Sequence, residues 1–304
     1  MLSVSRVPHY EMNVREGRSI NLRPGEARRR FRGYASALKR VPALVALLIL
    51  AALLAIAFTA PFVAPYDPLR TRVGDPLRGP SNQHLMGTDH LGRDVFSGFA
   101  YGARVSAVVG FVSASLSTII GILVGLPAGY RGGLIDDVLM RVVEFFQIMP
   151  LFVVALLATT LVGGSVFNVT VIIGLLSWAP IARTVRVQTL SLSAREFVMA
   201  ARALGASEVR ILVRHILPNS AGPVIVISTL QVGSAILAEA GLSFMGVGDP
   251  NLISWGQQLQ DAQRYLRTAW WMAVFPGAAI FFVVLSCNLL GDFLHEIANP
   301  FLRR

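Results

Sequence analysis

VSAVVGFVSASLSTIIGILVGLPAGY, residues 105–130, is a stretch of 26 residues that contains no Asp, Glu, Lys or Arg. A helix that crosses a bilayer needs about 20 mostly apolar residues, so this stretch predicts a membrane-spanning helix. The stretch 145–182 is also uncharged but too long for one span, and Gly163, Gly164 and Ser165 near its middle predict a tight turn between two spans. Three more uncharged stretches lie at 41–66, 216–238 and 268–291. The sequence therefore predicts an all-α membrane protein with six transmembrane helices.

The composition fits a membrane protein better than a soluble one. The chain has 304 residues, of which 54% are hydrophobic and only 14% charged, and its mean hydropathy is +0.60. About 25% of the residues in a soluble globular protein are charged, so a cytosolic enzyme with an ordinary polar surface and a disordered chain are both excluded. The net charge of +10 would suit nucleic acid. Beside such long apolar runs it is better explained by membrane topology, and no nucleic-acid partner is expected.

Basic residues are distributed unevenly between the predicted loops. Residues 1–40 carry ten Lys and Arg against three Glu, and residues 183–214 carry six Arg against two Glu. Basic segments stay on the cytoplasmic side, which places both termini there. The predicted organisation is a basic cytoplasmic tail at 1–40 that contacts membrane lipid, a first transmembrane helix at 41–66, an extracytoplasmic linker at 67–104, and a five-helix core at 105–304 with a cytoplasmic loop at 183–217.

Two carboxylates lie within or beside the predicted spans. Glu144 is near the start of the third span and Glu239 near the end of the fifth. A carboxylate in the membrane is a candidate for a substrate pathway. Both lie near span ends, where water or an Arg can reach them, and Glu144 is three residues from Arg141, a spacing typical of a helical ion pair. A structural role is therefore favoured for each.

Small residues recur every four positions in the second span, at Gly121, Gly125 and Gly129. This spacing lets two helix backbones approach closely in lipid. Packing within the chain is favoured over contact with another subunit.

The longest cytoplasmic loop contains REFVMAARALGAS at residues 195–207. Its strong helix formers predict a short helix, Gly205 is expected to end it, and Ser207 is expected to cap a second short helix. Phe197, Ala201 and Leu204 are expected to share one face. From the residues alone, insertion into a groove on another protein and contact with anionic lipid remain equally supported.

The same loop resembles the EAA loop of ABC-importer permeases. Ala200, Ala201, Gly205, Leu217 and Pro218 match that pattern at the right spacing, whereas Met199 replaces its Glu and His215 its Ile. The resemblance implies that this loop forms a coupling helix that docks on a cytoplasmic ATPase. The residues that it assigns to ATPase coupling are Met199, Ala200, Ala201, Arg202, Leu204, Gly205, Ala206, Ser207, Arg210, Leu217 and Pro218.

Further stretches resemble the C-type permeases of dipeptide and oligopeptide importers: HLMGTD at 84–89, GRDV at 92–95, YGAR at 101–104, LSFMGVG at 242–248, FPG at 275–277 and NLLGD at 288–292. The resemblance implies a type I ABC-importer permease fold in the bacterial inner membrane. It also implies three kinds of partner: a second homologous permease, two ATP-binding cassette ATPase domains, and an extracytoplasmic peptide-binding protein.

Catalytic and cofactor sites are not expected in this chain. A Walker A site needs Gly-Lys-Ser/Thr, and the single lysine, Lys39, lies between Leu38 and Arg40. We therefore expect a transport subunit that is not an enzyme, with ATP and Mg²⁺ bound by partner chains. The five His and the single Cys suggest no metal site. Three alternatives remain open: a permease for another substrate such as nickel, an ion-coupled secondary carrier, and a membrane-embedded protease.

Overall fold

The computed structural model describes the backbone of residues 24–298 and the side chains of residues 41–297. The chain divides into two compact units, Met1–Arg40 and Val41–Arg304. The predicted lipid contacts of the tail lie outside the described side chains. Everything below concerns the second unit.

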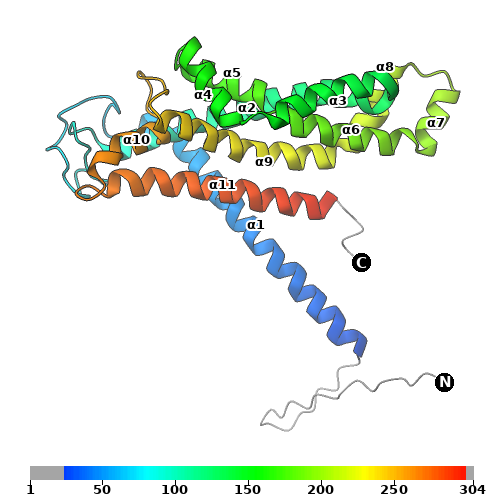
Figure 1. Ribbon diagram of the computed structural model, residues 1–304. Helices are drawn as coiled ribbons and strands as arrows, with labels where there is room; N and C mark the ends of the chain where they lie inside the picture. The colour runs from blue at the N-terminus through cyan, green and yellow to red at the C-terminus, as the bar shows by residue number, and fades with distance from the viewer. Residues whose placement is uncertain (1–23, 299–304) are drawn as a thin grey trace, which may run out of the picture. The chain divides into compact units, whose positions relative to one another are not determined.

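The regular secondary structure of the described residues is helical, as predicted, apart from one isolated bridge between Thr88 and Asp94. Its elements are α1 (Pro24–Val63), α2 (Val95–Arg131), α3 (Gly133–Ile148), α4 (Leu151–Val162), α5 (Val166–Leu176), α6 (Ala179–Ser193), α7 (Glu196–Ala203), α8 (Glu208–Ile211), the π-helical η1 (Leu212–Ile216), α9 (Leu217–Phe244), α10 (Trp255–Ala262), the 3₁₀-helical η2 (Gln263–Tyr265) and α11 (Trp271–Ala298). Helix α2 is the centre of the core and packs on α5, α6 and α9, while α9 also packs along α11 (Figure 1).

Five helical segments of the described chain are long and apolar enough to cross a membrane: Val41–Val63, Val95–Arg131, Val166–Ser193, Glu208–Phe244 and Trp271–Ile297. A sixth span exists only if α3 and α4, which meet at an angle of 84°, count together. The third predicted span is therefore broken. Pro150 causes the break, because it cannot donate a helical hydrogen bond and it forces Met149 into an extended conformation (ψ 131°).

The helices extend beyond the uncharged stretches that predicted them. Helix α2 begins at Val95, inside the predicted linker 67–104, because Asp94 caps it by accepting a hydrogen bond from the Ser97 N–H (2.7 Å). Helix α6 continues to Ser193, inside the predicted loop 183–217. The predicted turn after the third span is present, with Gly163 at φ 102° and Ser165 capping α5.

The glycine stripe of α2 packs within the chain, as expected. A Cβ at Gly125 would lie 2.5 Å from the carbonyl oxygen of Ala182, and one at Gly129 would lie 2.5 Å from that of Arg186. The C-terminal half of α2 is therefore in backbone contact with α6.

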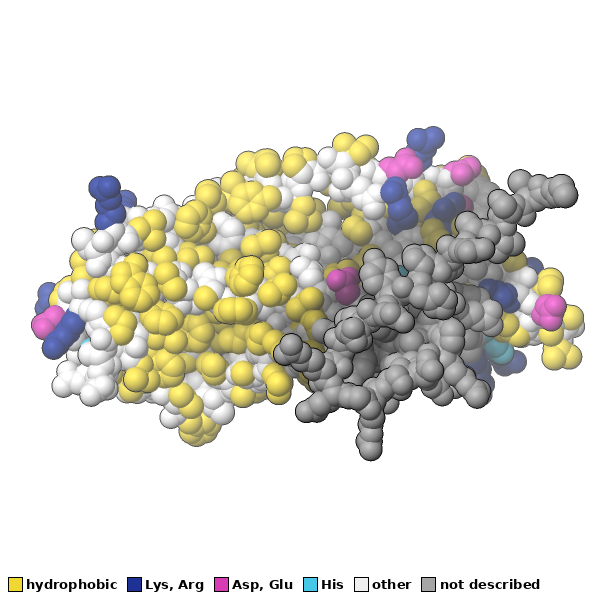
Figure 2. All heavy atoms as spheres, turned by 90° about the horizontal axis from the view of Figure 1, so that it is seen from below, with side chains coloured by type: hydrophobic (Ala, Val, Ile, Leu, Met, Phe, Trp, Pro, Cys, Tyr) yellow, Lys and Arg dark blue, Asp and Glu magenta, His cyan; other side chains and the backbone are white. Residues whose placement is uncertain are grey.

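Exposed apolar side chains cover much of the outer surface of the core. Phe62 of α1, Leu161 of α4 and Phe281 of α11 are 89%, 86% and 60% exposed. Figure 2 shows one such face, with hydrophobic side chains across its middle and charged ones toward its two ends. This distribution suits a bilayer whose headgroups meet the charged ends.

Candidate functional site

The loop between α6 and α9 is a short helix, a glycine turn and the start of a second helix. The first short helix, α7, ends before Gly205, whose backbone is in the left-handed conformation (φ 79°). The Gly205 N–H donates to the carbonyl of Arg202 (3.0 Å). Ser207 occupies the cap position of α8, but its hydroxyl makes no capping hydrogen bond. The predicted first helix and glycine turn are thus present. The second short helix is not separate, because α8, η1 and α9 run on as one helical segment, Glu208–Phe244, that contains Pro218.

The inward face of this loop differs from the predicted one. Val198 and Ile211 are fully buried in a cluster with Leu126 and Val185, and Ala201 packs against the same cluster. Ala201 is partly buried here, because it lies one helical turn from Val198 and the two form the apolar stripe by which α7 packs on the core.

The outward face of the loop carries unusually exposed apolar side chains. Leu204 is 88% exposed, Val209 70%, Met199 52% and Phe197 41%. Of the residues predicted to couple to an ATPase, Ala201, Ala206 and Leu217 face the chain's own core. The exposed ones are Met199, Ala200, Arg202, Leu204, Gly205, Ser207, Arg210 and Pro218.

Two polar contacts fasten the loop to the C-terminal end of α2. Arg131 donates from Nη2 and Nε to the same carboxylate oxygen of Glu208 (2.9 and 3.1 Å). Arg202 lies over the ring of Tyr130, 5.2 Å from its centre. Arg202, predicted to contact an ATPase, thus has a partner within this chain. Sequence reasoning missed these contacts because no spacing relates residues 130–131 to the loop.

A partly buried ion pair joins α3 to α6. Arg186 donates from Nε to one carboxylate oxygen of Asp136 and from Nη2 to the other, and each donor–acceptor distance is 2.5 Å. Asp136 is 8% exposed. The pair went unnoticed in the sequence because residues 131–141 carry balanced charge and Arg186 is counted with the next loop.

The two candidate carboxylates lie in different settings. Glu144 is half-exposed and 3.6 Å from Arg141, the expected helical pair. Glu239 is 3% exposed and accepts a hydrogen bond from the Ser243 hydroxyl (2.7 Å). The expectation that water or an Arg reaches Glu239 is wrong, because α9 continues to Phe244 and Gly256 of α10 packs directly on the backbone of Ala240.

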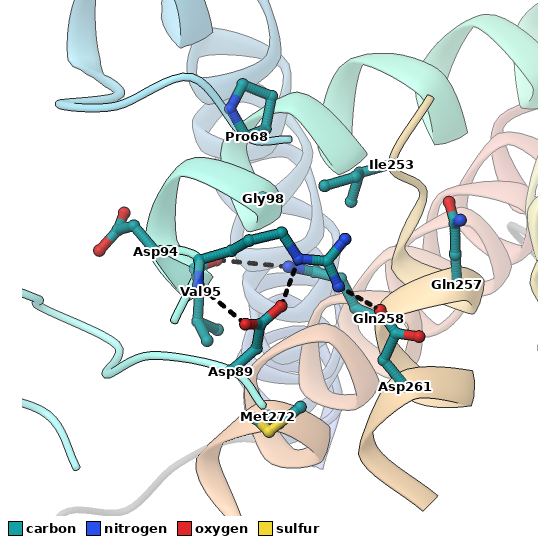
Figure 3. A pocket seen from close by; sticks show the side chains of 11 residues that line it. Pro68, Asp89, Asp94, Val95, Gly98, Ile253, Gln257, Gln258, Asp261 and Met272 are labelled. Atoms are coloured by element: carbon teal, nitrogen blue, oxygen red, sulfur yellow. Dashed lines mark hydrogen bonds and ion pairs between the residues drawn. The ribbon is translucent and has the colours of Figure 1, made fainter. Parts of the chain in front are cut away.

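At the other end of the core, Asp89, Arg93 and Asp261 form the outer cluster. The Arg93 guanidinium donates from Nε to Asp89 and from Nη2 to Asp261 (2.6 Å). Figure 3 shows these two carboxylates reaching it from different elements. Asp89 also accepts hydrogen bonds from the N–H groups of Leu91 and Arg93 (both 2.8 Å). Burial lowers the pKa of Arg93, but the two carboxylates raise that pKa by more, so the guanidinium stays charged.

A metal ion fits the outer cluster poorly. Asp89, His90 and Asp261 offer ligand atoms that lie within 4.8 Å of one another. The Arg93 guanidinium, however, already binds both carboxylates and would repel a cation. The cluster therefore ties the 67–94 segment to α10 as an ion-pair network.

The HLMGTD motif at residues 84–89 also has a structural role. The Thr88 hydroxyl donates to the carbonyl of Asp75 (2.6 Å), and Trp271 of α11 donates from its ring N–H to the Thr88 carbonyl (3.1 Å). Gly87 is in the left-handed conformation (φ 77°), and a Cβ there would lie 2.7 Å from the ring nitrogen of Trp271. This stretch therefore anchors the linker to α11.

Comparison with known proteins gives the family. Residues 121–304 match the family described as "Binding-protein-dependent transport system inner membrane component". The chain belongs to this family.

Several curated members of comparable length are similar to the chain. It is 38% identical to the dipeptide transport system permease protein DppC of Alkalihalophilus pseudofirmus. The aligned region of 259 residues covers 85% of each chain. It is 35% identical to the oligopeptide transport system permease protein OppC of Bacillus subtilis, with 86% of each covered. It is 38% identical to the glutathione transport system permease protein GsiD of Pectobacterium atrosepticum, over 83% of this chain and 84% of GsiD.

A solved structure supports the fold of this inner-membrane component. The MetNI methionine ABC transporter in an inward-facing conformation contains a chain that superposes with a TM-score of 0.56. The match covers 66% of this chain and 96% of that one at 17% identity, so it establishes the fold alone. With its apolar spans, the protein is a multi-pass protein of the bacterial inner membrane.

The family match includes the loop, both candidate carboxylates and Asp261 of the outer cluster. Asp89 and Arg93 lie before it, in the segment that precedes α2 and folds back onto α10. The loop and Asp261 thus lie at opposite ends of the matched core, as Figure 1 shows for α7 and α10.

Proposed function

We propose that this chain is a permease subunit of an ATP-driven importer for dipeptides or oligopeptides, and that it lines half of the translocation pathway. The observation that carries the proposal is the similarity, over about five-sixths of both chains, to permeases named for dipeptide, oligopeptide and glutathione transport. A second homologous permease would line the other half. An extracytoplasmic peptide-binding protein would deliver the substrate.

The loop between α6 and α9 is the proposed contact with the ATPase. Leu204, Phe197 and Met199 expose apolar surface at its tip, which suits insertion into a cleft of another protein. Met199 takes the place of the Glu of the family pattern and cannot make the polar contact that this Glu would make, but the docking itself does not depend on it. Arg202 and Arg210 are proposed to add charged contacts.

The mechanism we propose is conformational coupling. ATP and Mg²⁺ bind to two partner ATPase domains, whose closure moves the loop, and the helices attached to the loop change the side that the pathway faces. Coupling free energies of this kind are about 1–3 kcal/mol in many allosteric proteins. Glu144 and Glu239 remain candidates for the substrate pathway. The half-exposed Glu144 is the more accessible of the two.

The test is purification of the tagged protein in mild detergent with mass spectrometry of what accompanies it, followed by uptake in vesicles. We expect a second permease and one or two ATPase chains, and ATP-dependent uptake of a labelled dipeptide or oligopeptide in the presence of the binding protein. Uptake of nickel but not peptide would assign another substrate. Uptake driven by a membrane potential without ATP would reject the importer and favour an ion-coupled carrier.

A further inference from the structure

A cavity of about 230 Å³ lies between α1 and the core. Its walls come from α1, α2, α9, α11 and the start of α10, and they include Leu50, Leu54, Ala107, Val232, Cys287 and Leu290. Helices α1, α2, α9 and α11 each belong to a segment that is long and apolar enough to cross a membrane. The cavity therefore lies in the membrane-spanning part of the chain.

The lining leaves a ligand without strong hydrogen-bond donors. Of the described side chains that line the cavity, Thr229 and Trp255 carry the strong donors, and both are used within the chain. The Thr229 hydroxyl donates to the carbonyl of Ile225 (2.8 Å), and the Trp255 ring N–H donates to the carbonyl of Phe99 (3.0 Å). The Cys287 thiol is only a weak donor. A buried water needs about two to four polar partners, and a peptide needs partners for its backbone groups, so the cavity suits neither of them.

The cavity is continuous with the apolar outer surface of the spans. Phe111, which is part of the lining, is 52% exposed, and Val108 and Val112 beside it on α2 are each 49% exposed. On the α1 side, Leu47 and Leu48 are 53% and 68% exposed. A hydrocarbon chain of the surrounding bilayer can therefore enter the cavity without crossing a polar region.

The volume fits one thin, flexible chain. An apolar cavity of about 150 Å³ is enough to bind benzene, so this one has room for several methylene groups. A protein helix is about 10 Å across, and a single turn about 5.4 Å long already occupies more space than the cavity offers. A helix of another subunit therefore does not fit.

An empty cavity at this place would weaken the attachment of α1. Leu53, Ile56 and Ala57 of α1 pack on the core cluster that contains Ile236 and Cys287, and the cavity lies beside these contacts. Side chains that line a void lose their packing partners on one side, and the cost rises with the volume of the void. Filling the cavity would restore those contacts between α1 and the core.

We propose that the cavity binds an acyl chain of one membrane phospholipid, which completes the packing between α1 and the core. The chain enters beside Phe111 and contacts Val232 and Cys287. The charged headgroup stays at the membrane surface, because the cavity has no partner for it.

The first test is photo-crosslinking in vesicles. The protein is purified in mild detergent with the chains that accompany it and returned to vesicles of phosphatidylethanolamine and phosphatidylglycerol. The probe is phosphatidylethanolamine with a diazirine near the end of one acyl chain, and its adducts are mapped by mass spectrometry. We expect adducts at Val232 and at Cys287, which is only 2% exposed, as well as at Phe281, which is 60% exposed on α11. Adducts at Phe281 without any at Val232 or Cys287 would overturn the proposal.

The second test fills the cavity from two opposite walls. Ala107→Phe adds a ring from α2, and Leu54→Trp adds one from α1, which can shift outward because much of its surface is exposed. Each variant should lose the adducts at Val232 and Cys287 and keep those at Phe281. Val108→Phe is the matched control, because it adds the same ring to the exposed neighbour of Ala107 and should keep all three adducts. Adducts that persist at Val232 and Cys287 in the filled variants would show that the probe reaches them by another route, and the proposal would fail.

The third measurement counts the lipid that stays bound. After exchange into lipid-free detergent, native mass spectrometry should find one more phospholipid per copy of the unmodified chain than per copy of the Ala107→Phe chain. Val108→Phe should retain as much lipid as the unmodified chain. Equal counts for the unmodified and Ala107→Phe chains would contradict the proposal. Neither ATP nor peptide is needed for these measurements, so their outcome is independent of the importer assignment.

Discussion

The Arg186 guanidinium donates two hydrogen bonds to Asp136, one from Nε and one from Nη2, and each goes to a different carboxylate oxygen. This pair holds α6 against the first turn of α3. Such a two-point pair is specific to arginine, because lysine presents a single point charge. Asp136 is buried, so losing its partner would leave a charge in a poorly solvated place.

Asp136→Asn should destabilise the protein by about 2 kcal/mol, because Arg186 loses the carboxylate that accepts its two hydrogen bonds. The measurement is thermal unfolding of the purified complex in detergent. Asp137→Asn is the matched control: Asp137 is exposed and acts on Arg186 only through its charge, so this variant should lower the melting temperature less. Equal melting temperatures for the two variants would contradict the structural role of the pair.

Gly125→Val should prevent accumulation of folded protein, because a Cβ at this position would lie 2.5 Å from the Ala182 carbonyl and 2.7 Å from Val185. Overpacking of this kind costs about 1–3 kcal/mol, and more where a backbone atom is struck. The measurement is the amount of monodisperse protein recovered from membranes. Val112→Leu adds bulk to the exposed side of the same helix and should be neutral; if both variants accumulate normally, α2 and α6 are not in close contact.

The spans were predictable because lipid demands runs of uncharged residues, and such runs are visible without any knowledge of packing. The loop was predictable for a different reason, since Gly205 and Pro218 punctuate the chain locally. The break at Pro150 could have been foreseen from proline chemistry, but the uncharged stretch continued across it and suggested a single span.

Long-range polar contacts were the part that sequence reasoning missed. Asp136 and Arg186 are 50 residues apart, and nothing in their spacing reveals that α3 and α6 meet. Glu239 was misplaced for a related reason: its burial depends on α10, which folds back over the end of α9. A sequence gives the periodicity of one helix but not which neighbour covers it.

Arg93→Lys should destabilise the outer cluster by about 1–2 kcal/mol, because one ammonium cannot replace a guanidinium that binds Asp89 and Asp261 at once. The pKa of Arg93 is raised in the folded protein. Its contribution is therefore fully present below its ordinary pKa and is lost only at still higher pH. The Arg93→Lys variant should therefore lose the same number of degrees in melting temperature at pH 6 as at pH 9, because Arg93 stays charged over this range. Arg78→Lys, at an exposed pair with Asp75 (3.5 Å), should change the melting temperature little; a similar loss there would mean that Arg93 has no special role.

Leu204→Asp should leave the stability of the isolated chain unchanged, because the Leu204 side chain is 88% exposed. It should greatly reduce the ATPase that copurifies, since a carboxylate would have to be desolvated in an apolar cleft. Leu204→Met keeps the apolar surface and should copurify the ATPase normally. Undiminished recovery with Leu204→Asp would show that the tip of the loop is not the contact.

Gly205→Pro should uncouple transport from ATP hydrolysis. Gly205 has φ 79° and donates its N–H to Arg202, whereas proline fixes φ near −65° and has no N–H. The end of α7 would then be redirected while the buried anchors Val198 and Ile211 still hold the loop to the core. We expect normal membrane insertion and pairing with the second permease, and at least a ten-fold loss of substrate-stimulated ATP hydrolysis in reconstituted vesicles.

Gly205→Asn separates the effect of the backbone from that of a side chain at the tip of the loop. Asparagine tolerates the left-handed conformation better than other residues with a Cβ, and no neighbouring atom lies within 4 Å of where that Cβ would be. Gly205→Asn should therefore retain most of the stimulation. If asparagine is as damaging as proline, the glycine is needed for close approach of a partner and not for its dihedral angle; if proline is harmless, this turn does not couple the two activities.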